Sequence, residues 1–177
     1  MRPELASAHA PTLGSAGALV HIVEFIDPAC ETCAAFYPLV KQMLAEQAGR
    51  LRLSMRHVGF HPGADEVVRL LEASRAQDQY WRALETLLTL QDRWVQNHVA
   101  RPELALPLLS SLPLDLARLQ SEARAPAIAE RMRRDRADAA ALRVEKTPEY
   151  FVNGRQMASF GRQQLQALVR DELRRAY

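Results

Sequence analysis

Apolar positions in the first third of the chain switch between strand-like and helical spacing. An almost unbroken apolar run over residues 18–26 predicts a buried strand. Apolar side chains over residues 30–47 then fall on one side of a helix, which Gly49 would end. Between residues 51 and 57, apolar and polar positions alternate, as expected of a strand with one solvated face. The order strand, helix, strand predicts a parallel βαβ unit.

Helical spacing dominates the middle of the chain, and residues 63–142 contain no good strand pattern. The last helix of this block is predicted over residues 126–142, with Pro126 in its first turn. We interpret Trp81 and Trp94 as packing residues rather than as residues that stack on a ligand. Arginines and acidic residues are interleaved on the last helix, which favours a solvated face over a binding patch: Glu130, Arg131, Arg133, Arg134, Asp135, Arg136 and Asp138.

Strand signals return near the end of the chain. Residues 149–152 and 155–160 are joined by Asn153-Gly154, a dipeptide that favours the type I′ turn of a β-hairpin. A final helix is predicted over about residues 162–175. The whole order is βαβ, a helical block, then ββα, which predicts an α/β protein with helices packed on one sheet. In that sheet the first two strands are parallel and end at the same edge.

Composition and charge exclude several classes of protein. The 177 residues fit one domain, and 48% of them are apolar, enough for a proper core. A net charge of +2 is too weak to indicate a nucleic-acid-binding protein. No apolar run approaches about 18 residues, so we expect no membrane insertion. Residues 1–16 look like an irregular lead-in without the apolar stretch of a signal peptide.

The only two cysteines, Cys30 and Cys33, stand two residues apart where the buried strand gives way to a helix. A C-x-x-C beside a βαβ pattern is typical of a dithiol redox site. At the first turn of the helix, Cys30 would face unpaired N–H groups and the positive end of the helix dipole, both of which favour a thiolate. Cys33 lies about one turn further on and is less exposed. We therefore predict that Cys30 is the nucleophile and Cys33 the resolving thiol.

Glu24 is the second candidate catalytic residue. A carboxylate inside a strand that is apolar on both faces is costly unless it has a task. From its position six residues before Cys30, it could lie under the cysteines and exchange a proton with Cys33. Burial should raise its pKa, which suits this role. The alternative is a structural carboxylate that binds a water molecule or a basic partner.

Two other interpretations of the cysteines are weaker. Cys30, Cys33, His57 and His61 form C-x2-C followed by H-x3-H, which could indicate zinc. The 23 residues between Cys33 and His57 exceed finger-like spacing, and His57 falls in a strand rather than a helix. A permanent structural disulfide is also disfavoured, because so short a loop constrains the unfolded chain little. We therefore assign no metal ligands and expect no cofactor.

With these elements in place, the chain resembles the DsbA-like branch of the thioredoxin superfamily. The most specific matches are VEFIDPACETC at residues 23–33 and TPEYFVNG at residues 147–154, and the resemblance covers nearly all of residues 17–177. It implies a thioredoxin-like α/β fold with a βαβ…ββα central sheet. Residues 1–177 would then form a single DsbA-like domain, with a helical insertion within a thioredoxin core: the insertion is residues 63–142, and the core is residues 17–62 and 143–177.

The resemblance also implies roles for individual residues. The Thr147–Pro148 bond is expected to be cis and to face the cysteines, where it would bind an extended substrate peptide. Glu31 and Thr32 stand between the cysteines in place of the Pro-His of strongly oxidising relatives, and we expect them to tune the redox potential. His61, which follows a strand ending at the same sheet edge as Cys30, is a further candidate for redox tuning.

The function expected from these features is a monomeric thiol–disulfide oxidoreductase acting on exported proteins. It would form, reduce or reshuffle disulfides, and its redox partner is not identified. The resemblance places it in the periplasm or at the outer face of the cytoplasmic membrane, with a signal or anchor removed; a cytoplasmic location is the alternative. A metal-delivering adaptor that binds Cu(I) through the two thiols is a rival of another class, because Cu(I) favours soft ligands.

Overall fold

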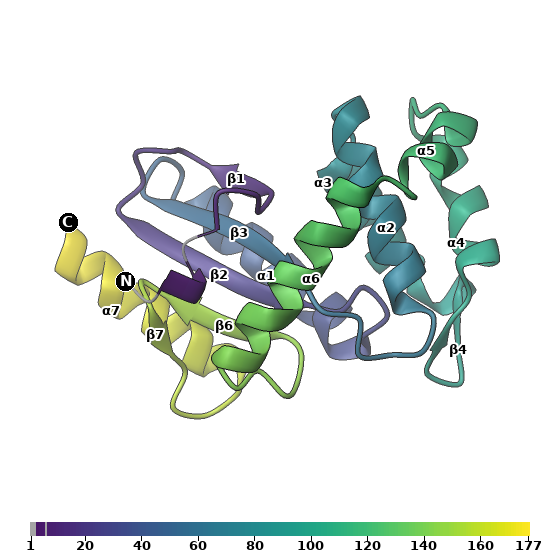
Figure 1. Cartoon of the computed structure of the whole chain (residues 1–177). Coiled ribbons are helices and arrows are strands. Elements are labelled where there is room, and N and C mark those ends of the chain that lie inside the picture. Colours follow the sequence, from purple (N-terminus) through teal and green to yellow (C-terminus); the bar gives the residue numbers. More distant parts are fainter. Residues whose placement is uncertain (1–2, 6) are drawn as a thin grey trace.

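A computed structural model describes residues 3–5 and 7–177, and a five-stranded sheet forms the side of the molecule that carries both ends of the chain (Figure 1). β2 and β3 are parallel and the other neighbouring strands are antiparallel, so the predicted βαβ unit is confirmed. Cys30 and the segment after β3 therefore leave the sheet at the same edge. In spatial order the strands are β1 (Thr12–Gly14), β3 (Leu51–His57), β2 (Val20–Ile26), β6 (Glu149–Val152) and β7 (Arg155–Gln156).

Three long helices cover the sheet. α1 (Glu31–Glu46) and α7 (Arg162–Ala176) contact each other and pack on one face, whereas α6 (Pro126–Ala141) crosses the other face (Figure 1). The final helix agrees with its prediction, and α1 begins one residue later than predicted because Cys30 forms its N-cap. Among the helices of the described residues, none combines the length and apolar character needed to cross a bilayer.

The alternation of side chains along β2 decides which residues meet the cysteines. Val20, Ile22 and Ile26 point to the face that α1 and α7 cover, whereas Val23 and Phe25 point to the face that α6 covers. Glu24 stands two positions from both Ile22 and Ile26, so its side chain points to the same face of the sheet as theirs. Its carboxyl group therefore points toward α1, the helix that carries Cys33.

Residues 64–122 form the helical group beside the sheet (Figure 1). The expectation of no strand was wrong, because a short hairpin joins two-residue strands at Val95–Gln96 (β4) and Val99–Ala100 (β5). Strands this short leave no alternating pattern to detect. The group comprises α2 (Ala64–Ser74), α3 (Tyr80–Thr89), α4 (Pro102–Leu108), α5 (Leu116–Glu122) and the 3-10 turns η2 (Arg75–Gln77), η3 (Gln91–Arg93) and η4 (Leu109–Ser111).

The prediction that β3 has one solvated face was wrong. Arg56 is fully buried, and its guanidinium group forms ion pairs with Asp135 and Asp138 of α6. The Asp135 carboxylate also accepts a hydrogen bond from the backbone N–H of His57 at 2.8 Å. The solvated-face interpretation of α6 therefore holds for Arg133, which pairs with an exposed neighbour, but not for the buried Asp135; Asp138 is partly exposed and pairs with Arg56.

The expectation of an irregular lead-in was wrong, because residues 12–14 pair with β3 at the edge of the sheet, and the second strand of the C-terminal hairpin is shorter than predicted. The lead-in contains the 3-10 turn η1 (Pro3–Leu5) and the edge strand β1, and the second strand of the hairpin is limited to β7. Asn153 and Gly154 have positive φ values of 48° and 83°, as a type I′ turn requires. Trp94 is fully buried and its indole N–H donates to the Leu87 carbonyl oxygen, which confirms its packing role.

Candidate active site

The junction between β2 and α1 brings the two cysteines together. Cys30 caps α1, and its sulfur accepts a hydrogen bond from the backbone N–H of Cys33 at 3.4 Å. Its thiol donates to the carbonyl oxygen of Thr147 at 3.3 Å. Both cysteines are free thiols; Cys30 is 7% exposed, whereas Cys33 is fully buried. The predicted order of exposure is therefore confirmed.

Hydrogen bonds at the helix start lower the pKa of the Cys30 thiol from 9.0 to about 6. The largest contribution comes from the Cys33 side chain, and burial opposes the shift. A hydrogen bond with the Thr147 side chain, and hydrogen bonds from the backbone N–H groups of Cys33 and Thr32, also lower this pKa. Thr32 thus acts on the sulfur through its backbone. At pH 7, about 90% of Cys30 would be thiolate.

The pKa of Cys33 shifts in the opposite direction. Burial is the first cause that raises it well above 9.0, followed by the hydrogen bond with Cys30 and the charges of Cys30 and Glu24. Cys33 is therefore a thiol at neutral pH, and a base must take its proton before it can attack a disulfide.

Glu24 offers a carboxyl group on the same side of the sheet. It is fully buried, and this burial raises its pKa from 4.5 to about 8, with a smaller contribution from the charge of Cys30. The Tyr150 hydroxyl donates to Glu24 Oε1 at 3.2 Å and opposes the shift. Among the described residues Tyr150 is its only hydrogen-bond partner, so the structure offers no basic partner for the alternative of an ion-paired structural carboxylate.

The segment opposite Cys30 has the geometry that the resemblance implied. The Thr147–Pro148 bond is cis, and the Thr147 carbonyl faces the Cys30 sulfur. An exposed aromatic ring lies nearby: Phe160 contacts Phe36 of α1 with 4.8 Å between ring centroids. This places an open apolar side chain next to the helix that carries the cysteines.

Asp27 is a site residue that the sequence analysis did not single out. Its buried carboxylate accepts hydrogen bonds from the N–H groups of Ala29, Phe60 and His61, and it binds His61 Nδ1 at 2.7 Å. It thereby ties the loop before Cys30 to the loop after β3. An aspartate at the carboxyl end of a buried parallel strand was the signal that could have revealed it.

Gln91 is a second residue that the sequence did not reveal. Its side-chain amide reaches from η3 and donates to the carbonyl oxygens of Pro28 at 2.8 Å and Cys30 at 3.0 Å. Beside it lies a hollow of about 370 Å³ that includes Glu31, whose side chain is exposed. The hollow is lined by Ala29, Glu31, Gln91, Asp92, Val95, Asn97 and His98. The redox-tuning role of Glu31 stays a prediction.

The two histidines of the zinc alternative are engaged elsewhere. His57 is buried with Nε2 at 2.7 Å from the Tyr80 hydroxyl, and His61 binds Asp27 and stacks on His98. Across residues 3–5 and 7–177, no three His, Cys, Asp or Glu side chains are grouped to hold a metal ion. The proposed effect of His61 on the redox pair stays a prediction, since its recorded contacts are with Asp27 and His98.

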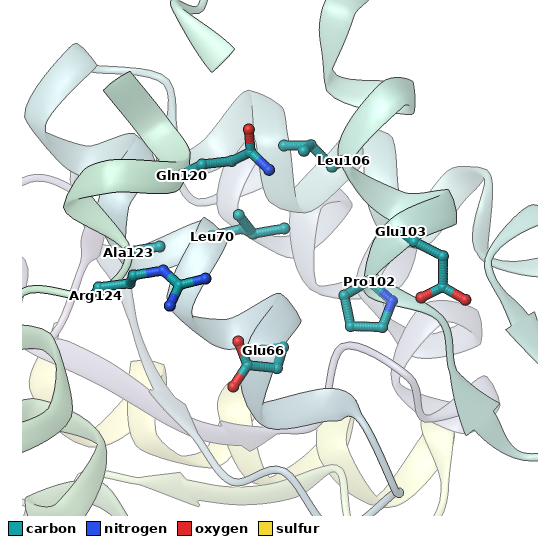
Figure 2. Close-up of a pocket in the computed structure, with 8 residues that line it drawn as sticks. All are labelled: Glu66, Leu70, Pro102, Glu103, Leu106, Gln120, Ala123 and Arg124. Carbon is teal, nitrogen blue, oxygen red and sulfur yellow. The ribbon is translucent and has the colours of Figure 1, made fainter. Parts of the chain in front are cut away.

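Another pocket lies away from the cysteines, within the helical group (Figure 2). It has a volume of about 340 Å³, and side chains of α2 and α4 and of α5 with the residues after it surround it. None of the predicted site residues lines it. Its lining residues are Glu66, Leu70, Pro102, Glu103, Leu106, Gln120, Ala123 and Arg124.

A five-stranded sheet with a helical insertion and two free cysteines at a helix start defines a thioredoxin-like fold with a dithiol site. The family follows from the sequence: the model described as Thioredoxin (Thioredoxin_4) matches residues 7–171, and the chain belongs to this family. Both findings confirm the resemblance that the motifs indicated.

Solved structures have the same fold. A thioredoxin-like oxidoreductase from Silicibacter pomeroyi DSS-3 has a TM-score of 0.85 at 24% identity, covering 100% of this chain and 99% of that one. Oxidised BdbD from Bacillus subtilis has a TM-score of 0.82 at 22% identity, covering 94% of both chains. The α-DsbA1 protein from Wolbachia pipientis has a TM-score of 0.79 at 15% identity, covering 97% of this chain and 94% of that one.

The curated relatives are much longer proteins. The Na(+)/H(+) antiporter NhaA of Herminiimonas arsenicoxydans is 31% identical over 144 residues, which are 81% of this chain and 22% of the antiporter. The Na(+)/H(+) antiporter NhaA 3 of Salinispora tropica is 33% identical over 146 residues, which are 80% of this chain and 21% of the antiporter. The chain thus spans about a fifth of the length of the curated relatives it matches.

Proposed function

We propose that this protein exchanges disulfides with exported proteins through the Cys30–Cys33 pair. The observation that carries the proposal is the environment of the Cys30 sulfur. The pKa of this thiol is lowered, the buried Cys33 lies one helical turn away, and the sulfur faces the cis Thr147–Pro148 segment. The backbone of residue 147 is kept out of the helical region by Pro148, so it is suited to pair with an extended peptide.

Each half of the exchange can be written with its electrons and protons. In the oxidising direction a substrate thiolate attacks Cys30 Sγ of the Cys30–Cys33 disulfide, and Cys33 leaves as a thiolate that takes a proton from Glu24. A second substrate thiolate then attacks the substrate sulfur of the mixed disulfide, and the reduced pair is released. In the reducing direction the Cys30 thiolate attacks a substrate disulfide, Glu24 takes the Cys33 proton, and the Cys33 thiolate displaces the substrate thiolate from Cys30.

The lowered pKa of Cys30 bears on the direction of the reaction. A thiolate stabilised in the reduced state raises the reduction potential, which makes the pair more oxidising. For a shift from 9.0 to about 6, the stabilisation at pH 7 is on the order of 1 kcal/mol, which corresponds to a few tens of millivolts. Solvent screening at the partly open sulfur makes the real value smaller.

The test is the equilibrium of the pair with glutathione, together with oxidation of a reduced unfolded protein and reduction of insulin. We expect a defined Cys30–Cys33 potential and turnover in at least one assay, and both should disappear in Cys30→Ser. Tight Cu(I) binding by the reduced protein without turnover in either assay would instead support the adaptor function.

The location outside the cytoplasm is part of the same proposal. The similarity to proteins named Na(+)/H(+) antiporters supports a position at a membrane. A charged, membrane-impermeant thiol reagent applied to intact cells should label Cys30 of the reduced protein. Labelling only after the cells are broken would assign the protein to the cytoplasm.

A further inference from the structure

Tyr150 connects three parts of the active site. It lies directly opposite Glu24 in the β2–β6 pair and two residues after the cis-proline Pro148. Its side chain is fully buried, and its ring stacks on Phe36 of α1 with 6.1 Å between ring centroids and 27° between ring planes. A strand on one side and a helix on the other therefore fix the position of its hydroxyl group.

The two carboxyl oxygens of Glu24 have different surroundings. Oε1 accepts the hydrogen bond from the Tyr150 hydroxyl at 3.2 Å. Oε2 is also buried, and among the described residues it has no hydrogen-bond partner. Burial and the neighbouring Glu24 charge raise the pKa of the Tyr150 hydroxyl well above 10.0, so it keeps its proton and acts as a donor at neutral pH.

We propose that Tyr150 is a positioning residue for thiol–disulfide exchange: its hydroxyl holds Glu24 Oε1, which leaves Oε2 to exchange the proton of Cys33. The proposal rests on the proposed function, because it requires Cys33 to resolve a mixed disulfide. Oε1 already accepts a hydrogen bond from the Tyr150 hydroxyl and is therefore the less favourable oxygen to protonate. The carboxylic acid proton of Glu24 therefore resides on Oε2.

The proton transfer that this arrangement controls is the one that frees Cys33. Glu24 Oε2 takes the proton from the Cys33 thiol, and the Cys33 thiolate attacks Cys30 Sγ of the mixed disulfide. The Cys30–Cys33 bond forms, and the bond to the leaving sulfur breaks with its electron pair. The charge of Cys30 raises the pKa of Glu24. The charge of Glu24 in turn raises the pKa values of Cys33 and Tyr37 at α1 and of Tyr150 on β6. On β3, Glu24 lies beside the apolar Met55.

The experiment uses Tyr150→Phe, which removes the hydroxyl and keeps the ring on Phe36. Reduced protein is mixed with an equimolar amount of 5,5′-dithiobis(2-nitrobenzoate) in a stopped-flow instrument across a pH series. The first phase releases one thionitrobenzoate when Cys30 attacks, and the second phase releases another when Cys33 resolves the mixed disulfide. The pH midpoint of the second phase reports the coupled Glu24–Cys33 pair.

Loss of a hydrogen bond to the charged carboxylate should move that midpoint up by about one pH unit, so the second phase becomes about tenfold slower below it. The first phase should not change, because Tyr150 is not among the groups that shift the Cys30 pKa. Tyr80→Phe is the matched control: it removes another buried hydroxyl, bonded to His57, and should leave both phases as they are.

Three outcomes separate the possibilities. A second-phase profile that moves in Glu24→Gln but not in Tyr150→Phe would overturn the positioning role and leave the proposed function intact. Equal shifts in Tyr150→Phe and Tyr80→Phe would make the effect one of packing and would also overturn it. A wild-type protein without a second phase would refute the proposed function itself, because Cys33 would not resolve.

Discussion

Replacement of Glu24 by Gln should change how the stability of the reduced protein depends on pH. The folded pKa of Glu24 is about 8, against 4.5 for an unburied carboxyl group. Between these values the folded protein holds a proton that the unfolded chain has released. The contribution of Glu24 to stability is therefore fully present below pH 4.5 and is lost progressively as the pH rises through 8.

The magnitude follows from the two pKa values. Relative to low pH, the loss is about 1 kcal/mol at pH 5, about 3 kcal/mol at pH 7 and about 4 kcal/mol at pH 8. Glutamine does not titrate, so the free energy of unfolding of wild type minus that of Glu24→Gln should fall by roughly 3 to 4 kcal/mol from pH 5 to pH 8. The lost hydrogen bonds of the variant add a constant offset that does not affect this slope.

Urea denaturation of the reduced proteins at a series of pH values measures the difference. The lowered pKa of Cys30 acts in the opposite direction, because the folded state releases that proton earlier, but this effect is common to both proteins. Repeating the pair in a Cys30→Ser background removes it altogether. Parallel curves for wild type and Glu24→Gln between pH 5 and 8 would refute the buried, proton-holding carboxyl group.

Three further outcomes are expected. Iodoacetamide should label Cys30 faster than Cys33 in the reduced protein, with a rate that rises around pH 6; the reverse order would exchange their roles. Glu31→His should raise the reduction potential, because it replaces an anion beside the Cys30 thiolate, and an unchanged or lower potential would remove Glu31 from the explanation. Arg56→Met should lower the free energy of unfolding by about 3–5 kcal/mol, since it leaves Asp135 buried without its guanidinium partner; an unchanged urea midpoint would show that the pair contributes little.

The sequence predicted the parts of the fold that depend on neighbouring residues. Apolar spacing located the β2 strand, the α1 helix and the last helix, since the burial of one face follows a period of two or of 3.6 residues. The Asn153-Gly154 turn was predictable because few other residues tolerate positive φ at both positions.

The errors arose where burial depends on a distant element. The alternation in β3 predicted a solvated Arg56, and its burial is made tolerable by the aspartates of α6, 79 and 82 positions away, and by the carbonyl oxygen of Glu4. A charge pattern on one helix does not show which of its carboxylates meets an arginine on another element. The helix had to be docked on the sheet before Asp135 and Asp138 could be distinguished from the solvated charges around them.

The sequence by itself determined the arrangement of the two thiols. Cys30, which is the N-cap of α1, and Cys33 lie within four consecutive residues, so their geometry follows from one helical turn. The tertiary structure alone decided what surrounds them. Tyr150 reaches Glu24 across 126 positions of sequence, and Gln91 reaches the Cys30 carbonyl across 61. Such contacts are set by the packing of whole strands and helices, whose register and docking no local pattern of side chains specifies.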